Sequence, residues 1–154
     1  MIQQFLKSSL KWATPINPAS IVNFVSTNGY QVYPFMSGYS ISKLGVIQLS
    51  AHIAATYPET VTCVAVNPGL TDTDLPHPAI RAAGFHLNDP DLSGGTALWL
   101  AADPVRSRFL NGRMISSMWD IEELVARKDE IVRENLLTID LRGTFGLDQF
   151  KDKA

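Results

Sequence analysis

Three side chains capable of acid–base chemistry lie within residues 26 to 43. Tyr39 and Lys43 are four residues apart at the start of a helical pattern, so we expect them on one helix face, one turn apart. A lysine ammonium group stabilises a nearby phenolate, the form that a tyrosine adopts when it gives up its proton. Ser26 ends the preceding apolar run, where its hydroxyl could hold a carbonyl oxygen. The three residues indicate a site that moves a proton at the oxygen of a carbonyl or carbinol carbon.

Hydrophobic patterning predicts the elements that position these side chains. Ile21 to Ser26 and Val61 to Val66 are compact apolar runs, which are typical of buried parallel strands. Between them we expect a helix from about Ser37 to Thr56, which ends at Tyr57-Pro58. The residues predicted on its buried side are Ile41, Leu44, Ile47 or Val46, and Ile53.

The remaining patterns predict further elements on both sides of this unit. We expect a short helix within residues 2–12, a helix at Gly94 to Ala102 that Asp91 or Ser93 caps, a strand at Arg113 to Ser117, and a charged helix from Asp120 to Asn135. Strands separated by helices form parallel sheets, in which ligands bind beyond the carboxyl ends of the strands. Ser26 and the segment 67–73 both fall at such ends, which supports a site there.

These residues together resemble a known pattern. The serine 13 residues before Tyr39 and the sequence YSISK at 39–43 resemble the S…YxxxK signature of the short-chain dehydrogenase/reductase family. The Asn67-Pro68-Gly69 turn, which Thr71 and Thr73 follow, resembles a second sequence motif of the same family. The resemblance implies an NAD(P)-dependent oxidoreductase that acts on a ketone or secondary alcohol.

The resemblance also implies a role for each matching residue. Tyr39 would exchange the proton, Lys43 would assist it and bind the nicotinamide ribose, and Ser26 would orient the substrate. Cofactor contacts are implied for Tyr39, Lys43, Pro68, Gly69, Thr71 and Thr73. Local turn chemistry explains Ser26 and the threonines as an alternative. The long segment from Leu70 to Pro90 would shape the substrate pocket.

The resemblance covers the second half of the family fold. A Gly-rich turn that holds pyrophosphate is expected after the first strand of a dinucleotide-binding fold. The only candidate in this sequence is Ser93-Gly94-Gly95, which lies at a predicted helix start and follows no strand. In the family layout that turn and the Asn-Ala-Gly element would precede Met1. We therefore predict a single α/β domain, 1–154, with a partial Rossmann-like parallel sheet that lacks the first βαβ units and has an open edge.

The missing motif leaves two other functions open. One is a truncated relative without redox activity, such as a cofactor-independent isomerase, dehydratase or cyclase with the same three residues. The other is a non-catalytic partner of a complete homologue. The long helix that carries Tyr39 builds dimer faces in the family, so the resemblance implies a homo- or hetero-oligomer. The wider pattern is similar to fungal reductases and suggests a role in secondary metabolism.

Composition excludes several classes of protein. The 154 residues carry a net charge of −2 without a basic cluster, which argues against nucleic-acid binding. No run of apolar residues reaches the 18 that a membrane span needs. The single cysteine, Cys63, is predicted to be buried, and we expect a cytoplasmic protein. No metal site is predicted, since His52, His77 and His86 form no ligand pattern, and Trp12, Trp99 and Trp119 are interpreted as core anchors.

Overall fold

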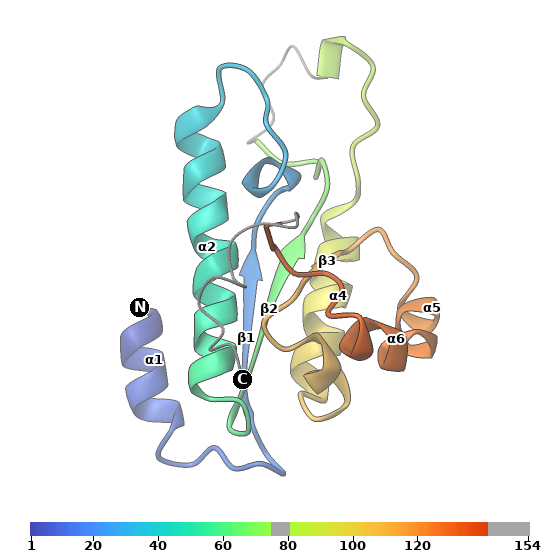
Figure 1. Ribbon diagram of the computed structural model, residues 1–154. Helices are drawn as coiled ribbons and strands as arrows, with labels where there is room; N and C mark the ends of the chain where they lie inside the picture. Colours follow the sequence, from blue (N-terminus) through green and yellow to red (C-terminus); the bar gives the residue numbers. More distant parts are fainter. Residues whose placement is uncertain (75–80, 142–154) are drawn as a thin grey trace, which may run out of the picture.

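The computed structural model describes residues 1–74 and 81–141. His77, the middle of the 70–90 segment and the polar tail after Leu141 lie outside the described residues. In the described residues the chain forms one three-stranded sheet with helices on both of its faces (Figure 1). The predicted α/β class is therefore confirmed.

The sheet is parallel, and its strands follow one another in chain order. It consists of β1 (Ala19–Phe24), β2 (Val61–Asn67) and β3 (Met114–Ser116), with β2 in the centre. Ala19 pairs with Val61 and Phe24 with Val66, so the carboxyl ends of β1 and β2 lie side by side. All seven residues of β2 are buried, which explains why this strand is a continuous apolar run.

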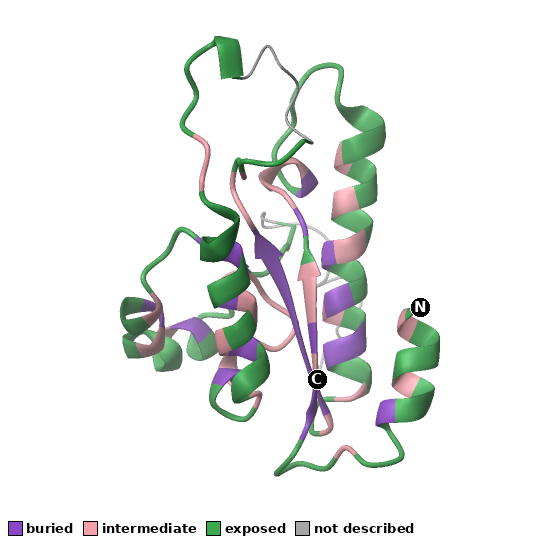
Figure 2. Cartoon of the chain, turned by 180° about the vertical axis from the view of Figure 1, so that it is seen from behind, coloured by how far each residue is buried: buried purple, intermediate pink, exposed green. Residues whose placement is uncertain are grey.

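Residues of β2 alternate between two helical layers. Ala65 packs with Val25 and with Ile47 of α2 (Ser37–Thr56) on one face of the sheet. Val64 and Val66 pack with Leu100 of α4 (Pro90–Ala102) on the other face. Figure 1 shows α2 and α4 on opposite sides of the strands, and Figure 2 shows the buried stripe of α2 turned toward the sheet. The two layers hold the strands from both sides, as in a doubly wound fold.

Shorter elements complete the described chain. They are α1 (Ile2–Ser9), the 3-10 helices η1 (Thr27–Gly29) and η2 (Arg106–Leu110), α5 (Ile121–Ala126) and α6 (Lys128–Arg133). In residues 1–74 and 81–141, no helix combines the length and apolar character that crossing a bilayer requires.

Some element boundaries differ from the predictions. The first strand ends at Phe24, and Ser26 caps η1 instead of ending the strand. Helix α4 begins at Pro90, because Asp89 caps it by accepting a hydrogen bond from the Asp91 amide at 2.9 Å. The predicted charged helix is two helices, α5 and α6, which meet at Arg127.

Several predicted core residues are exposed. Ile41 is 68% exposed, and Leu44 is 37% exposed, so only Ile47 and Ile53 of the predicted set are buried. The cause is that α2 is apolar around most of its circumference, which hides the side that faces the sheet. Trp12 and Trp119 are also about half exposed, and their assignment to the core was wrong. Trp99 packs at the edge of the main hydrophobic cluster.

Candidate functional site

The loop that carries Ser26 leaves the carboxyl end of β1. The Ser26 hydroxyl donates to Asn28 Oδ1 at 3.1 Å and accepts from the Asn28 amide at 3.3 Å. These bonds cap η1, so in this structure the hydroxyl takes part in the local turn that the sequence offered as an alternative role. Ser26 is half-buried. A substrate oxygen would therefore have to share or replace the bonds to Asn28.

Tyr39 and Lys43 lie one turn apart in the first part of α2, where the spacing placed them. The Lys43 ammonium nitrogen is 5.6 Å from the centre of the Tyr39 ring. It also donates to the Phe24 carbonyl at 3.2 Å, which ties α2 to the end of β1. Tyr39 is 38% exposed, and within the described chain its hydroxyl makes no hydrogen bond. The phenol is thus open to solvent, with a cation beside it.

A glycine holds the Ser26 loop against this helix. A β-carbon on Gly29 would lie 3.1 Å from the backbone nitrogen of Leu44 and 2.6 Å from the end of the Ile47 side chain. Only a residue without a side chain permits such an approach of two backbones. The contact lies directly beside Lys43, so the loop and the start of α2 form one packed unit.

The Asn67-Pro68-Gly69 turn leaves the carboxyl end of β2. Gly69 has φ +73°, which a glycine adopts without strain, and its amide donates to Asn67 Oδ1 at 3.3 Å. The Thr71 hydroxyl donates to the Pro68 carbonyl at 3.4 Å, and the Thr73 carbonyl accepts from Arg81. The Val25 amide donates to the Val66 carbonyl at 2.8 Å, so this turn and the Ser26 loop leave the same edge of the sheet.

The structure therefore brings together some of the predicted residues. Tyr39 and Lys43 are adjacent, and Ser26 lies in the loop packed on the same helix. Among the described residues no hydrogen bond joins Ser26 to Tyr39, or the 67–73 segment to either. The arrangement offers a phenol proton, a nearby cation and a hydroxyl at one end of a parallel sheet, which are the groups needed for proton transfer at a carbonyl oxygen.

Two cavities lie near β3, and the sequence did not point to them. The first has a volume of about 470 Å³ and lies over α5 and α6, and the second has about 400 Å³ and lies at the carboxyl ends of β2 and β3. Ser26, Tyr39 and Lys43 line neither of them. Trp119 lines both cavities. The signal in the sequence that could have indicated them is the position of this tryptophan, just after an apolar run and just before an acidic helix.

Cys63 is buried in the middle of β2, as predicted. Burial raises the pKa of its thiol from 9.0 to about 11, although a hydrogen bond with Ser50 opposes this shift. The Asn23 amide also lies 3.7 Å from the sulfur. A thiol in this setting stays protonated and unreactive at neutral pH, so it has no part in the site.

This burial predicts a loss of stability in alkali. The folded thiol holds its proton more strongly than the unfolded one, so its contribution is complete below pH 9 and disappears as pH rises through about 11. Between pH 8 and 11, we expect the natural protein to lose about 2 kcal/mol of unfolding free energy relative to Cys63→Ala. Urea unfolding of both proteins at the two pH values measures this difference. An equal loss in both proteins would contradict the assignment.

Comparison with known proteins gives consistent relatives. The sequence model of the family described as short chain dehydrogenase matches residues 5–83. A short chain dehydrogenase of Monascus purpureus is 32% identical over 124 residues, which are 79% of this chain and 42% of the relative. The chain spans less than half the length of the curated relatives that it matches.

Solved structures agree with these relatives. A short chain dehydrogenase from Salmonella enterica serovar Typhi superposes with a TM-score of 0.62 at 24% identity, over 77% of this chain and 47% of that one. A 3-oxoacyl-[acyl-carrier protein] reductase with bound NAD from Brucella melitensis superposes with a TM-score of 0.52 at 27% identity, over 63% of this chain and 38% of that one.

Proposed function

Because the chain belongs to the short-chain dehydrogenase family, we propose that it carries the proton-transfer half of an NAD(P)-dependent oxidoreductase. The substrate would be a ketone or a secondary alcohol. Tyr39 would give its proton to the carbonyl oxygen, Lys43 would stabilise the phenolate that remains, and Ser26 would hold the oxygen in place. The observation that carries the proposal is the position of the Lys43 ammonium nitrogen, which lies 5.6 Å from the centre of the Tyr39 ring and is bonded to the end of β1.

The residues present fit the nicotinamide end of the cofactor. The Lys43 ammonium group has three donors, and the Phe24 carbonyl accepts one hydrogen bond from it, which leaves donors for ribose hydroxyls. The segment that follows β2 contains Pro68, Gly69, Thr71 and Thr73. It begins at the carboxyl end of this strand, and in open parallel sheets dinucleotides bind at that edge. When bound, NAD(P)H supplies the hydride, which no side chain can provide.

Cofactor titration tests this proposal. We expect saturable changes in NADPH or NADH fluorescence when the protein is added, and we expect Lys43→Met to weaken binding about tenfold, the size of one charge-assisted hydrogen bond. Lys11→Met removes a charge from the chain just after α1 and should leave binding unchanged. The absence of binding at millimolar cofactor, with a folded protein, would refute autonomous redox activity.

The class of substrate is proposed from the relatives. Short chain dehydrogenases from Monascus and Claviceps are each 32% identical to this chain. We propose that this chain acts on a small molecule, in fungal-type secondary metabolism. In the described part of the 70–90 segment, the Asn88 amide donates to the Leu70 carbonyl at 2.6 Å, so the two ends of the loop that is proposed to shape the substrate pocket lie side by side.

A second candidate function is that of a non-catalytic partner of another family member. The observation in its favour is the outer face of α2, where Ile41 and Leu49 are 68% and 41% exposed and Gly38 and Gly45 leave open space beside them. Such a surface suits association through α2 with a second copy or a homologue.

This surface predicts a change of mass on substitution. If the chain associates through α2, Ile41→Glu should shift it to monomer in light scattering, because two carboxylates would be buried at a symmetric contact. The matched variant Ile16→Glu, at a residue 89% exposed in the loop before β1, should leave the mass unchanged. A natural protein that is monomeric at every concentration would refute association of the chain with itself.

A further inference from the structure

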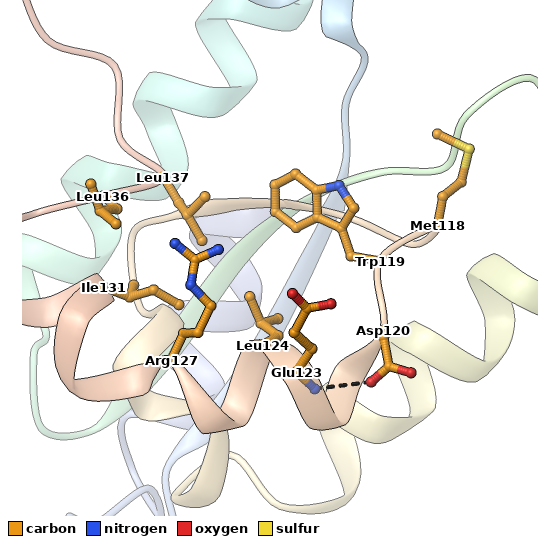
Figure 3. Close-up of a pocket in the computed structure, with 9 residues that line it drawn as sticks. All are labelled: Met118, Trp119, Asp120, Glu123, Leu124, Arg127, Ile131, Leu136 and Leu137. Carbon is orange, nitrogen blue, oxygen red and sulfur yellow. Dashed lines mark hydrogen bonds between the residues drawn. The ribbon is translucent and has the colours of Figure 1, made fainter.

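The two cavities beside β3 adjoin one another and share two lining residues, Trp119 and Leu137. Their volumes of about 470 and 400 Å³ each lie in the range of small-molecule sites. Figure 3 shows the first cavity, with the Trp119 ring and the Leu137 side chain above α5 and α6. We refer to the pair as the Trp119 cavity.

The wall of the Trp119 cavity is held in place by the backbone. Leu137 has φ +63°, an uncommon conformation for a leucine, and its carbonyl accepts a hydrogen bond from the Met114 amide at 2.9 Å. Arg113 donates to the neighbouring Leu136 carbonyl at 2.6 Å. A bulky residue keeps a strained conformation only where its surroundings fix it, and such residues gather at binding sites.

The Trp119 cavity combines an aromatic wall with acidic groups. Trp119 is 46% exposed, so its ring face is available for stacking. Asp120, Glu123 and Asp140 line the two cavities and bring three negative charges. Figure 3 shows the Glu123 carboxylate directed from α5 toward Trp119, and within the described chain it forms no salt bridge.

One cation, Arg127, lines the same cavity, but a neighbouring carboxylate compensates its charge. Its guanidinium group donates to both oxygens of Glu130, at 2.8 and 3.1 Å. The lining is therefore negative overall. A negative lining repels phosphates and carboxylates and attracts cations, and a tryptophan face binds cations as well.

We propose that the Trp119 cavity binds a flat, apolar molecule with one protonated amine, with its ring against Trp119 and its nitrogen near Glu123. Neither cavity is lined by Tyr39 or Lys43, and the amine would bind in the first one, over α5 and α6. The second cavity includes Asn67, the first residue of the turn that is proposed to contact the cofactor. Binding of the amine beside Glu123 does not require the cofactor, since the charge of this lining is opposite to the one that a dinucleotide phosphate requires.

Three probes with one ring system and different charges test the proposal. They are 1-naphthylmethylamine, 1-naphthylmethanol and 1-naphthylacetate, titrated by calorimetry into the full chain at low ionic strength without NAD(P). We expect the amine to bind about tenfold more tightly than the carboxylate, with the alcohol between them. Equal affinities, a preference for the carboxylate or no binding of the amine would overturn the proposal.

Variants locate the binding of the amine. Glu123→Gln should weaken the amine about threefold to tenfold and leave the alcohol unchanged. Glu122→Gln removes the same charge from the adjacent residue, which does not line the cavity, and should change neither. Trp119→Ala should weaken the amine and the alcohol about tenfold, and Trp119→Phe, which keeps a ring, should restore most of the affinity. Equal effects at 122 and 123, or full binding in a folded Trp119→Ala, would overturn the proposal.

Discussion

Tyr39→Phe is expected to lower the rate of NADPH-dependent ketone reduction by at least about a hundredfold. The substitution keeps the ring beside Lys43 and removes only the hydroxyl, which makes no hydrogen bond within the described chain. Stability should therefore stay the same while the proton donor is lost. Rates with aryl ketones at saturating NADPH, together with urea unfolding, measure the two quantities separately.

Tyr33→Phe is the matched control for this experiment. Tyr33 lies in the loop between β1 and α2, a few residues before Tyr39, and its hydroxyl donates to Gln31 at 2.6 Å. The control should lose less than about twofold in rate, because Gln31 is exposed and water can replace the tyrosine hydroxyl. If Tyr39→Phe retains the natural rate, another group supplies the proton and the proposed role of Tyr39 is wrong.

Arg113→Met is expected to cost about 3 kcal/mol of unfolding free energy. The Arg113 guanidinium donates to the Phe109 carbonyl at 3.0 Å, to Asn135 Oδ1 at 3.1 Å and to the Leu136 carbonyl at 2.6 Å. Burial lowers the pKa of Arg113, but the group remains charged. Methionine has a similar length and no donor, so two carbonyl groups would lose their partner.

The control for Arg113 is Arg133→Met at the end of α6. Arg133 pairs with Glu134 at 2.9 Å on the surface, where ion pairs contribute little, and its loss should cost less than about 0.5 kcal/mol. Urea denaturation at pH 7 compares the two variants. If both variants are as stable as the natural protein, the bonds of Arg113 do not hold the turn after α6.

Local patterns predicted the central part of the fold well. The bounds of α2 agree with the predicted helix, because Pro58 and the change in composition mark its end. The β2 strand was recognisable because it is buried on both faces and is apolar throughout. The spacing of Tyr39 and Lys43 placed them on one helix face, since helical geometry alone determines which residues are one turn apart.

Features that depend on tertiary contacts were not predictable in the same way. The end of β1 depends on the η1 turn, which the Ser26 hydroxyl caps, and no periodicity encodes that bond. Ile41 was assigned to the buried side because an all-apolar helix gives no signal of its orientation. The Trp119 cavity lies between β3 and the turn after α6. The position of that turn depends on the hydrogen bond from Arg113 to the Leu136 carbonyl, which the sequence does not reveal.

The close approach of Gly29 to the backbone of α2 has a practical consequence for protein engineering. It anchors the chain just before residues 31–36, and that stretch is exposed at every position. A randomised library or a short peptide graft at 31–36 should therefore be tolerated without moving Lys43.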